Sequence, residues 1–192
     1  MTPKPELYFE TDNEWREWLQ ENHATSKGVY LILYRVSSVK ASMRWEEAVR
    51  VALCYGWIDS TAKRIDDEKR KQLFTPRKPK SVWSKVNKVH VQELIDLDLM
   101  HESGLYKIEA AKKDGSWIAL DDVEDLVIPE DLLAAFETHP VAFKNYSAFS
   151  RSYRKNYLYW LNSAKRTTTR EKRISEIIKC CNENLKMRPG VR

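Results

Sequence analysis

The stretch WEEAVRVALCYGWID, residues 45–59, decides the predicted fold because it changes from helix to strand at a single glycine. Apolar side chains in its first half lie three or four positions apart, so we expect a helix over residues 42–55 with Trp45 on the buried face. Gly56 occupies the position where a left-handed residue commonly ends a helix. The β-favouring residue Trp57 then begins a strand.

The segments on either side of this stretch predict a small sheet. Residues 29–36 (VYLILYRV) are mostly β-branched or aromatic and too apolar for a surface strand, so they predict a central strand. Residues 57–74 predict two strands joined by a polar turn at Asp66–Lys69. Prolines at positions 76 and 79 disfavour both a helix and a regular ladder, so residues 75–79 are expected to form a loop.

Helices are expected before and after these strands. Thr11 and Glu14 have capping-box spacing and predict a helix over residues 12–23. Ser81 is expected to cap a later helix that ends near Leu99. The side chains expected to point inward from that helix are Val82, Val86, Val89, Leu94 and Leu97. Further helices are predicted at residues 103–113, 130–138, 140–149, 151–165 and 168–186.

Together these elements predict an α+β protein. A small mixed or antiparallel sheet with helices is followed by an all-helical C-terminal part. We place the domain boundary at residue 125, so that residues 1–125 form the α+β domain and residues 126–192 form a helical subdomain packed on it. A chain of 192 residues is long enough to bury such a core.

The charges of the chain lie in blocks. The net charge is +5, and residues 63–88 carry +7, residues 89–140 carry −10 and residues 151–192 carry +9. In one interpretation these blocks fold against each other and neutralise. In the other, a basic surface faces an anionic partner such as nucleic acid, a phosphate-bearing ligand or anionic lipid.

Composition argues against several classes of protein. The longest purely apolar run, Val29–Tyr34, is short, so no membrane span is expected. No apolar signal core follows Met1, so we expect a cytoplasmic location. Three cysteines, two of them adjacent at Cys180 and Cys181, do not make a disulfide framework. The four histidines lie far apart in the sequence, and no metal site or cofactor is expected.

Residues with binding chemistry gather between residues 56 and 87. Loops at strand ends and helix starts commonly point such side chains into clefts. Arg77 offers a bidentate fork for an anionic group, and tryptophans offer flat apolar walls. The residues expected to form this cleft are Trp57, Asp59, Thr75, Arg77, Trp83, Ser84 and Asn87. Its expected occupant is a small anionic ligand or a protein partner.

A purely structural interpretation of the same residues stays open. In that interpretation Trp57 and Trp83 are core residues. Asp59 then forms an ion pair with Arg64 or Arg77.

The same motifs carry a family resemblance. The runs WEEAVRVALCYGWID at residues 45–59 and FTPRKPKSVWSKVN at residues 74–87 resemble the YdeI/OmpD-associated, or bacteriocin-protection, family. The resemblance continues at residues 113–117 and through residues 152–174, so it covers nearly the whole chain. It implies a bacterial protein associated with stress or bacteriocin resistance, and it brings no established reaction and no catalytic residue. Ser60 departs from the family pattern, which commonly has glycine there.

Two other functions stay open beside ligand binding. A nucleic-acid interface on the C-terminal helices would combine cations with interleaved aromatic side chains. Its cations would be Arg154, Lys165, Arg166, Arg170 and Arg173. An enzyme of unknown reaction would use Asp59 for acid–base chemistry, although no motif joins a nucleophile to a base.

Overall fold

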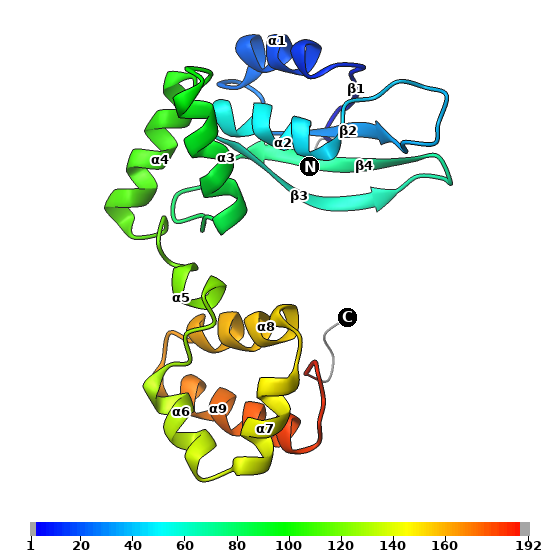
Figure 1. Cartoon of the computed structure of the whole chain (residues 1–192). Coiled ribbons are helices and arrows are strands. Elements are labelled where there is room, and N and C mark those ends of the chain that lie inside the picture. The colour runs from blue at the N-terminus through cyan, green and yellow to red at the C-terminus, as the bar shows by residue number, and fades with distance from the viewer. Residues whose placement is uncertain (1–2, 189–192) are drawn as a thin grey trace. The chain divides into compact units, whose positions relative to one another are not determined.

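The fold class predicted from the sequence is confirmed. The computed structural model describes residues 3–188, and the contacts of the chain divide after Ile118 into two units. The first unit holds a four-stranded mixed sheet with helices, and the regular elements described in the second unit are all helices (Figure 1). The domain boundary expected at residue 125 stays a prediction.

Four strands form the sheet of the first unit: β1 (Glu6–Tyr8), β2 (Val29–Tyr34), β3 (Trp57–Arg64) and β4 (Lys69–Pro76). Their order is β1-β2-β4-β3, with β1 parallel to β2 and the other pairs antiparallel. The predicted central strand is confirmed as β2, and the predicted pair of strands is confirmed as β3 and β4. The sequence does not predict β1, because three residues are too few to show alternation.

Strand β4 corrects the loop expected over residues 75–79. β2 pairs with β4 only as far as Phe74, whereas β3 continues to pair with Thr75 and Pro76. Beyond Phe74, β4 therefore has no partner on the side of β2 and forms an edge there. Proline is tolerated at an edge, because its missing N–H breaks no ladder bond there.

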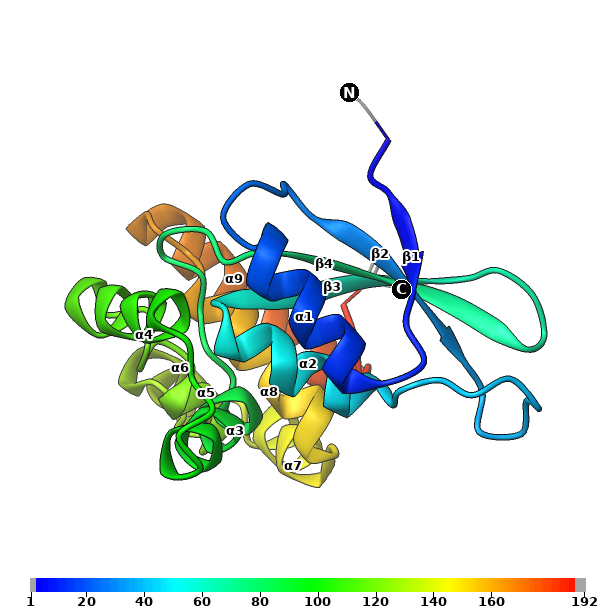
Figure 2. The same cartoon turned by 90° about the horizontal axis from the view of Figure 1, so that it is seen from above.

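Helices α1 (Asp12–Asn22) and α2 (Trp45–Cys54) cover the same face of the sheet (Figures 1 and 2). The capping box predicted for α1 is confirmed. The Thr11 hydroxyl accepts from the Glu14 N–H at 3.3 Å, and the Glu14 carboxylate accepts from the Thr11 N–H at 3.3 Å. The expectation that Trp45 is buried is wrong, because α2 begins at this residue and its side chain stays 43% exposed at the rim of the core.

Helices α3 (Lys85–Asp96) and α4 (Glu102–Asp114) follow the sheet in the first unit. α3 corrects the helix expected from residue 81, because Ser84 is its cap and accepts from the Asn87 N–H at 3.3 Å. The prediction that Leu94 points inward is confirmed, and the other buried side chain of this helix is Val91, which the sequence does not predict. The expected core residues that are exposed instead are Val82, Val86, Val89 and Leu97.

An aromatic cluster ties α1 to the sheet. The Trp15 ring stacks on the Trp18 ring at a centroid distance of 5.3 Å. It also meets Trp57 and Phe74 edge to face, at 6.3 and 5.7 Å. Such pairs bury large apolar areas and favour defined ring geometries, so α1, β3 and β4 share one core.

The second unit is organised around its last helix. α9 (Thr167–Asn182) contacts α6 (Glu130–Glu137), α7 (Pro140–Ala148) and α8 (Arg151–Asn162), and a short α5 (Asp121–Glu124) precedes them. The four predicted C-terminal helices are confirmed, although the last ends at Asn182 rather than at residue 186. Across residues 3–188, every helix is too short or too polar to reach from one side of a lipid bilayer to the other.

Gly104 is a position of the first unit that we expect to tolerate no side chain. It packs so closely on the end of α2 that a Cβ would lie 2.2 Å from the Cys54 carbonyl oxygen. Gly104→Ala is therefore expected to lower the free energy of unfolding by about 3 kcal/mol, at the upper end of the usual range for overpacking a core. Urea denaturation measures this change.

Gly115→Ala is the matched control. Gly115 has a φ of 79°, and apart from its immediate chain neighbours no described residue has an atom within 4 Å of the point where its Cβ would stand. Alanine there should cost only the strain of a left-handed backbone, about 1 kcal/mol. Equal losses in the two variants would contradict the close approach of α4 to α2.

Candidate functional site

Arg77 is the buried cation of the predicted cleft. It directly follows β4, and its backbone N–H donates to the Gly56 carbonyl oxygen at 2.9 Å. Only 3% of the residue is exposed. Its guanidinium carbon lies 3.6 Å from the centroid of the Trp83 ring, and a desolvated cation over an indole face is attracted to it. Burial lowers the pKa of Arg77 to about 10, and the charge of Asp59 opposes part of that shift.

The guanidinium of Arg77 has more donors than there are acceptors around it. Nη1 donates to the Val82 carbonyl oxygen at 3.2 Å and to the Ser81 hydroxyl at 3.5 Å. Nε and Nη2 have no acceptor in the part of the chain that the structure describes. Their N–H groups project in parallel from one edge of the planar group, and such an edge binds a carboxylate or phosphate through two hydrogen bonds.

Arg77 and Trp83 line a pocket of about 180 Å³ together with residues of α4. The cations that share this Arg77 pocket are Lys78, Lys80 and Lys107. Asp114 is the one acidic residue among the described lining residues. Its carboxylate already accepts from the backbone N–H groups of Lys80 at 3.1 Å and Ser116 at 2.9 Å. The pocket therefore has an excess of positive charge.

Sequence reasoning misses the α4 side of the Arg77 pocket. Tyr106 and Lys107 line it from that helix, and no local motif marks them. Gly56 permits the approach of Lys107, because a Cβ there would lie 2.6 Å from the Cγ of that residue. Its φ of 71° also confirms the predicted left-handed residue after α2. Gly56 is the one signal in the sequence that a second element, here α4, could pack closely at this point.

Most other residues predicted for the cleft stabilise the fold instead of lining the pocket. Trp57 is a core residue that is 1% exposed, and its indole N–H donates to the His23 carbonyl oxygen at 3.2 Å. Ser84 caps α3 by accepting from the Asn87 N–H. Thr75 lies in the ladder between β3 and β4. Of the seven predicted residues, the structure brings Arg77 and Trp83 together in the pocket.

Asp59 holds two neighbouring side chains rather than an arginine. Its Oδ2 accepts from the Trp45 indole N–H at 2.9 Å and from the Gln72 amide at 2.8 Å. Gln72 is 4% exposed, and its amide also donates to the Ser60 carbonyl oxygen at 3.0 Å. Asp59 therefore orients the exposed Trp45 ring and satisfies a buried amide, and the ion pair considered from the sequence does not form among the described residues.

The basic residues considered for nucleic-acid binding lie in the second unit. Arg170 forms an ion pair with Asp131, with Nη2 and Oδ1 2.9 Å apart. Arg173 donates to the Ser163 hydroxyl at 2.8 Å, and its guanidinium carbon lies 5.0 Å from the Trp160 ring centroid. The remaining three are a half-buried Arg154 and an exposed Lys165 and Arg166. Two of the five cations thus make contacts that hold the second unit together.

The donors of the Arg77 pocket suit an oxoanion rather than a metal ion. Guanidinium and ammonium groups carry only hydrogen-bond donors and offer no lone pair to a cation. Within residues 3–188, no three histidine, cysteine, aspartate or glutamate side chains gather closely enough to hold a metal.

Two family models match the chain. Residues 7–107 match a domain of unknown function (DUF8412). Residues 125–184 match the family described as bacteriocin-protection, YdeI or OmpD-associated. The motifs at residues 45–59 and 74–87 fall within the first match, whereas the second match spans α6 to α9. No curated protein and no solved structure matches the chain.

Asp59→Ala tests the hydrogen bonds that Asp59 accepts. The change leaves a buried N–H of Gln72 without an acceptor, so the free energy of unfolding should fall by about 2 kcal/mol. Urea denaturation measures this loss. The Trp45 ring also loses its partner, and near-ultraviolet circular dichroism should report its reorientation.

Asp67→Ala is the matched control for this variant. The Asp67 side chain is 85% exposed and pairs with Arg64 at the surface, and exposed pairs add little stability. A loss in Asp59→Ala no larger than the loss in Asp67→Ala would show that Asp59 is not a structural acceptor.

Proposed function

We propose that this chain is a binding protein that holds a small oxoanion in the Arg77 pocket. The chain belongs to the bacteriocin-protection, YdeI or OmpD-associated family, with a domain of unknown function as its first part. The observation that carries the proposal is the buried guanidinium edge, whose Nε and Nη2 have no acceptor among the described residues. A buried donor without a partner costs about 1–3 kcal/mol. A bound carboxylate or phosphate would supply both acceptors and the missing negative charge.

The size of the pocket supports a small ligand. Its volume of about 180 Å³ corresponds to about six water molecules at ~30 Å³ each. That space suits an inorganic phosphate or a short carboxylate. The neighbouring lysines raise the local positive potential, which attracts an anion, and the Trp83 ring shields one face of the guanidinium from water.

We also propose a physiological role for this binding, based on the family. The binding would serve resistance to stress or to bacteriocins, in the cytoplasm. The description of the matched family supports the bacteriocin role, the resemblance of the sequence motifs supports the stress role, and the composition supports the location.

Isothermal titration calorimetry at low salt, with sodium phosphate and sodium acetate, tests the Arg77 pocket. The parent protein is expected to bind at least one of these anions. Arg77→Lys keeps the charge but loses the planar fork, so it should weaken binding at least tenfold, because a hydrogen bond to a charged group contributes about 1.5–3 kcal/mol. Arg77→Met should abolish binding.

Lys113→Ala is the matched control because it removes one exposed positive charge from the last turn of α4. It should bind as the parent does, and thermal melting followed by circular dichroism verifies that each variant is folded. Unchanged binding in Arg77→Met, or no binding of either anion by the parent, would refute the proposal.

A short duplex DNA in the same buffer tests the alternative function. DNA binding that weakens steeply with salt and persists in Arg77→Met would place the function on the exposed cations of the second unit, Lys165 and Arg166. The absence of such binding, together with anion binding that depends on Arg77, would support the Arg77 pocket.

A further inference from the structure

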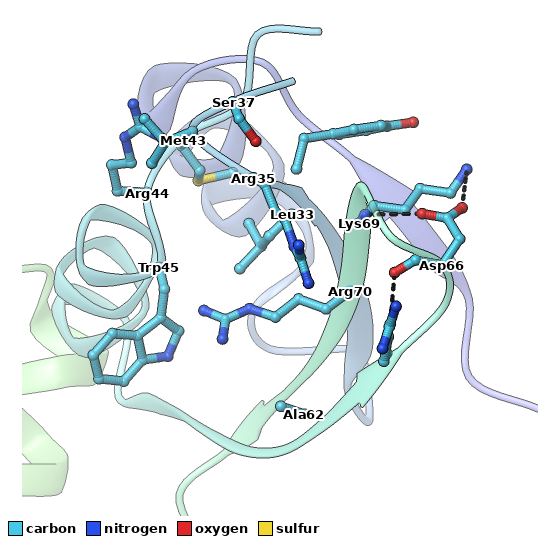
Figure 3. Close-up of a pocket in the computed structure, with 13 residues that line it drawn as sticks. Leu33, Arg35, Ser37, Met43, Arg44, Trp45, Ala62, Asp66, Lys69 and Arg70 are labelled. Atoms are coloured by element: carbon cyan, nitrogen blue, oxygen red, sulfur yellow. Dashed lines mark hydrogen bonds and ion pairs between the residues drawn. The ribbon is translucent and has the colours of Figure 1, made fainter. Parts of the chain in front are cut away.

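A second pocket of the first unit opens beside the first residue of α2, between the start of that helix and the hairpin of β3 and β4 (Figure 3). Arg70 pairs in register with Leu33 on one side and with Arg64 on the other, so these side chains share one face of the sheet. Leu33 belongs to the core, but α2 begins only at Trp45 and leaves this end of the face open. The resulting space of about 720 Å³ lies within the range of small-molecule sites, about 300–1,000 Å³.

Among the described residues, five cations and one acid line this second pocket. The cations are Arg35, Arg44, Arg64, Lys69 and Arg70. The acid, Asp66, already accepts from the backbone N–H groups of Glu68 and Lys69, each at 2.9 Å. Arg35 and Arg70 form no ion pair with any described residue, and their side chains extend into the middle of the pocket (Figure 3). Converging like charges repel unless an anion lies between them.

Trp45 forms the wall toward which Arg70 extends (Figure 3). The residue is 43% exposed, and its indole N–H donates to Asp59 at 2.9 Å, which fixes the orientation of the ring. Leu33 and Met43 add apolar surface beside it. An exposed indole that is held in place is a platform on which a planar aromatic group can stack.

We propose that this second pocket binds a nucleoside monophosphate, with the phosphate between Arg35 and Arg70 and the base stacked on Trp45. The two guanidinium groups match a phosphate in charge and in hydrogen-bond geometry. The volume is about 720 Å³ against about 180 Å³ for the Arg77 pocket, so there is room for a base and a sugar as well. No described residue lines both pockets, and the inference does not rest on the proposed function.

Isothermal titration calorimetry at low salt with adenosine 5′-monophosphate, ribose 5-phosphate and adenosine separates the two halves of the ligand. The monophosphate is expected to bind at least tenfold more tightly than either fragment. Arg70→Ala should weaken binding of the monophosphate and of ribose 5-phosphate at least tenfold. Trp45→Leu should weaken binding of the monophosphate about tenfold and leave the affinity for ribose 5-phosphate unchanged. Trp45→Phe keeps an aromatic ring and should therefore lose less affinity for the monophosphate.

Lys113→Ala is again the matched control, since it removes one exposed cation outside the pocket and should bind the monophosphate as the parent does. Arg70 and Trp45 are exposed, so their replacement leaves the core intact, and thermal melting verifies this. Equal affinity for the monophosphate and ribose 5-phosphate, unchanged affinity in Arg70→Ala, or an equal loss in Lys113→Ala would overturn the inference. Much tighter binding of single-stranded decathymidylate through Arg70 and Trp45 would also overturn it, in favour of a nucleic-acid strand.

Discussion

Side-chain alternation along β4 is the constraint on which the rest of the first unit depends. Phe74, Gln72 and Arg70 are two positions apart, so they point to the same face of the sheet. The aromatic cluster covers Phe74, Asp59 satisfies the amide of Gln72, and Arg70 lies beyond the start of α2, where no helix covers the sheet. One strand face thus leads from a dry core, through a buried polar contact, to an open cationic pocket. A shift of one residue in register would move all three side chains to the other face.

The two pockets of the first unit present positive charge in different physical states. Arg77 is buried against Trp83, and burial lowers its pKa to about 10. An anion bound there interacts across a medium of low polarity, where attraction is strong and desolvation is costly. Arg35 and Arg70 are exposed, so their attraction for an anion is screened by salt. Stacking on Trp45 is the contribution that would make the second pocket selective.

Local sequence signals predict elements well where one signal dominates and less well where two compete. The capping box at Thr11 and the apolar run of β2 each have one interpretation, and both predictions are confirmed. For α3 the sequence predicts Ser81 as the cap, although another serine follows three positions later. The Ser81 hydroxyl lies near Arg77, at 3.5 Å from Nη1, and Ser84 caps the helix. The position of Arg77, the neighbour of Ser81, is not specified by the local sequence pattern at the start of α3.

The sequence by itself determined the type and order of most elements and the α+β class, and it indicated Arg77 and Trp83 as candidate residues of one site. Only the tertiary structure decided that Trp57 lies in the core while Trp45 stands at a rim, and that Lys107 joins Arg77. It also decided that Arg35 and Arg70 meet in one pocket. The physical reason is that periodicity specifies which face of a segment is apolar. Which part of that face is covered, and by what, depends on contacts between residues far apart in the chain.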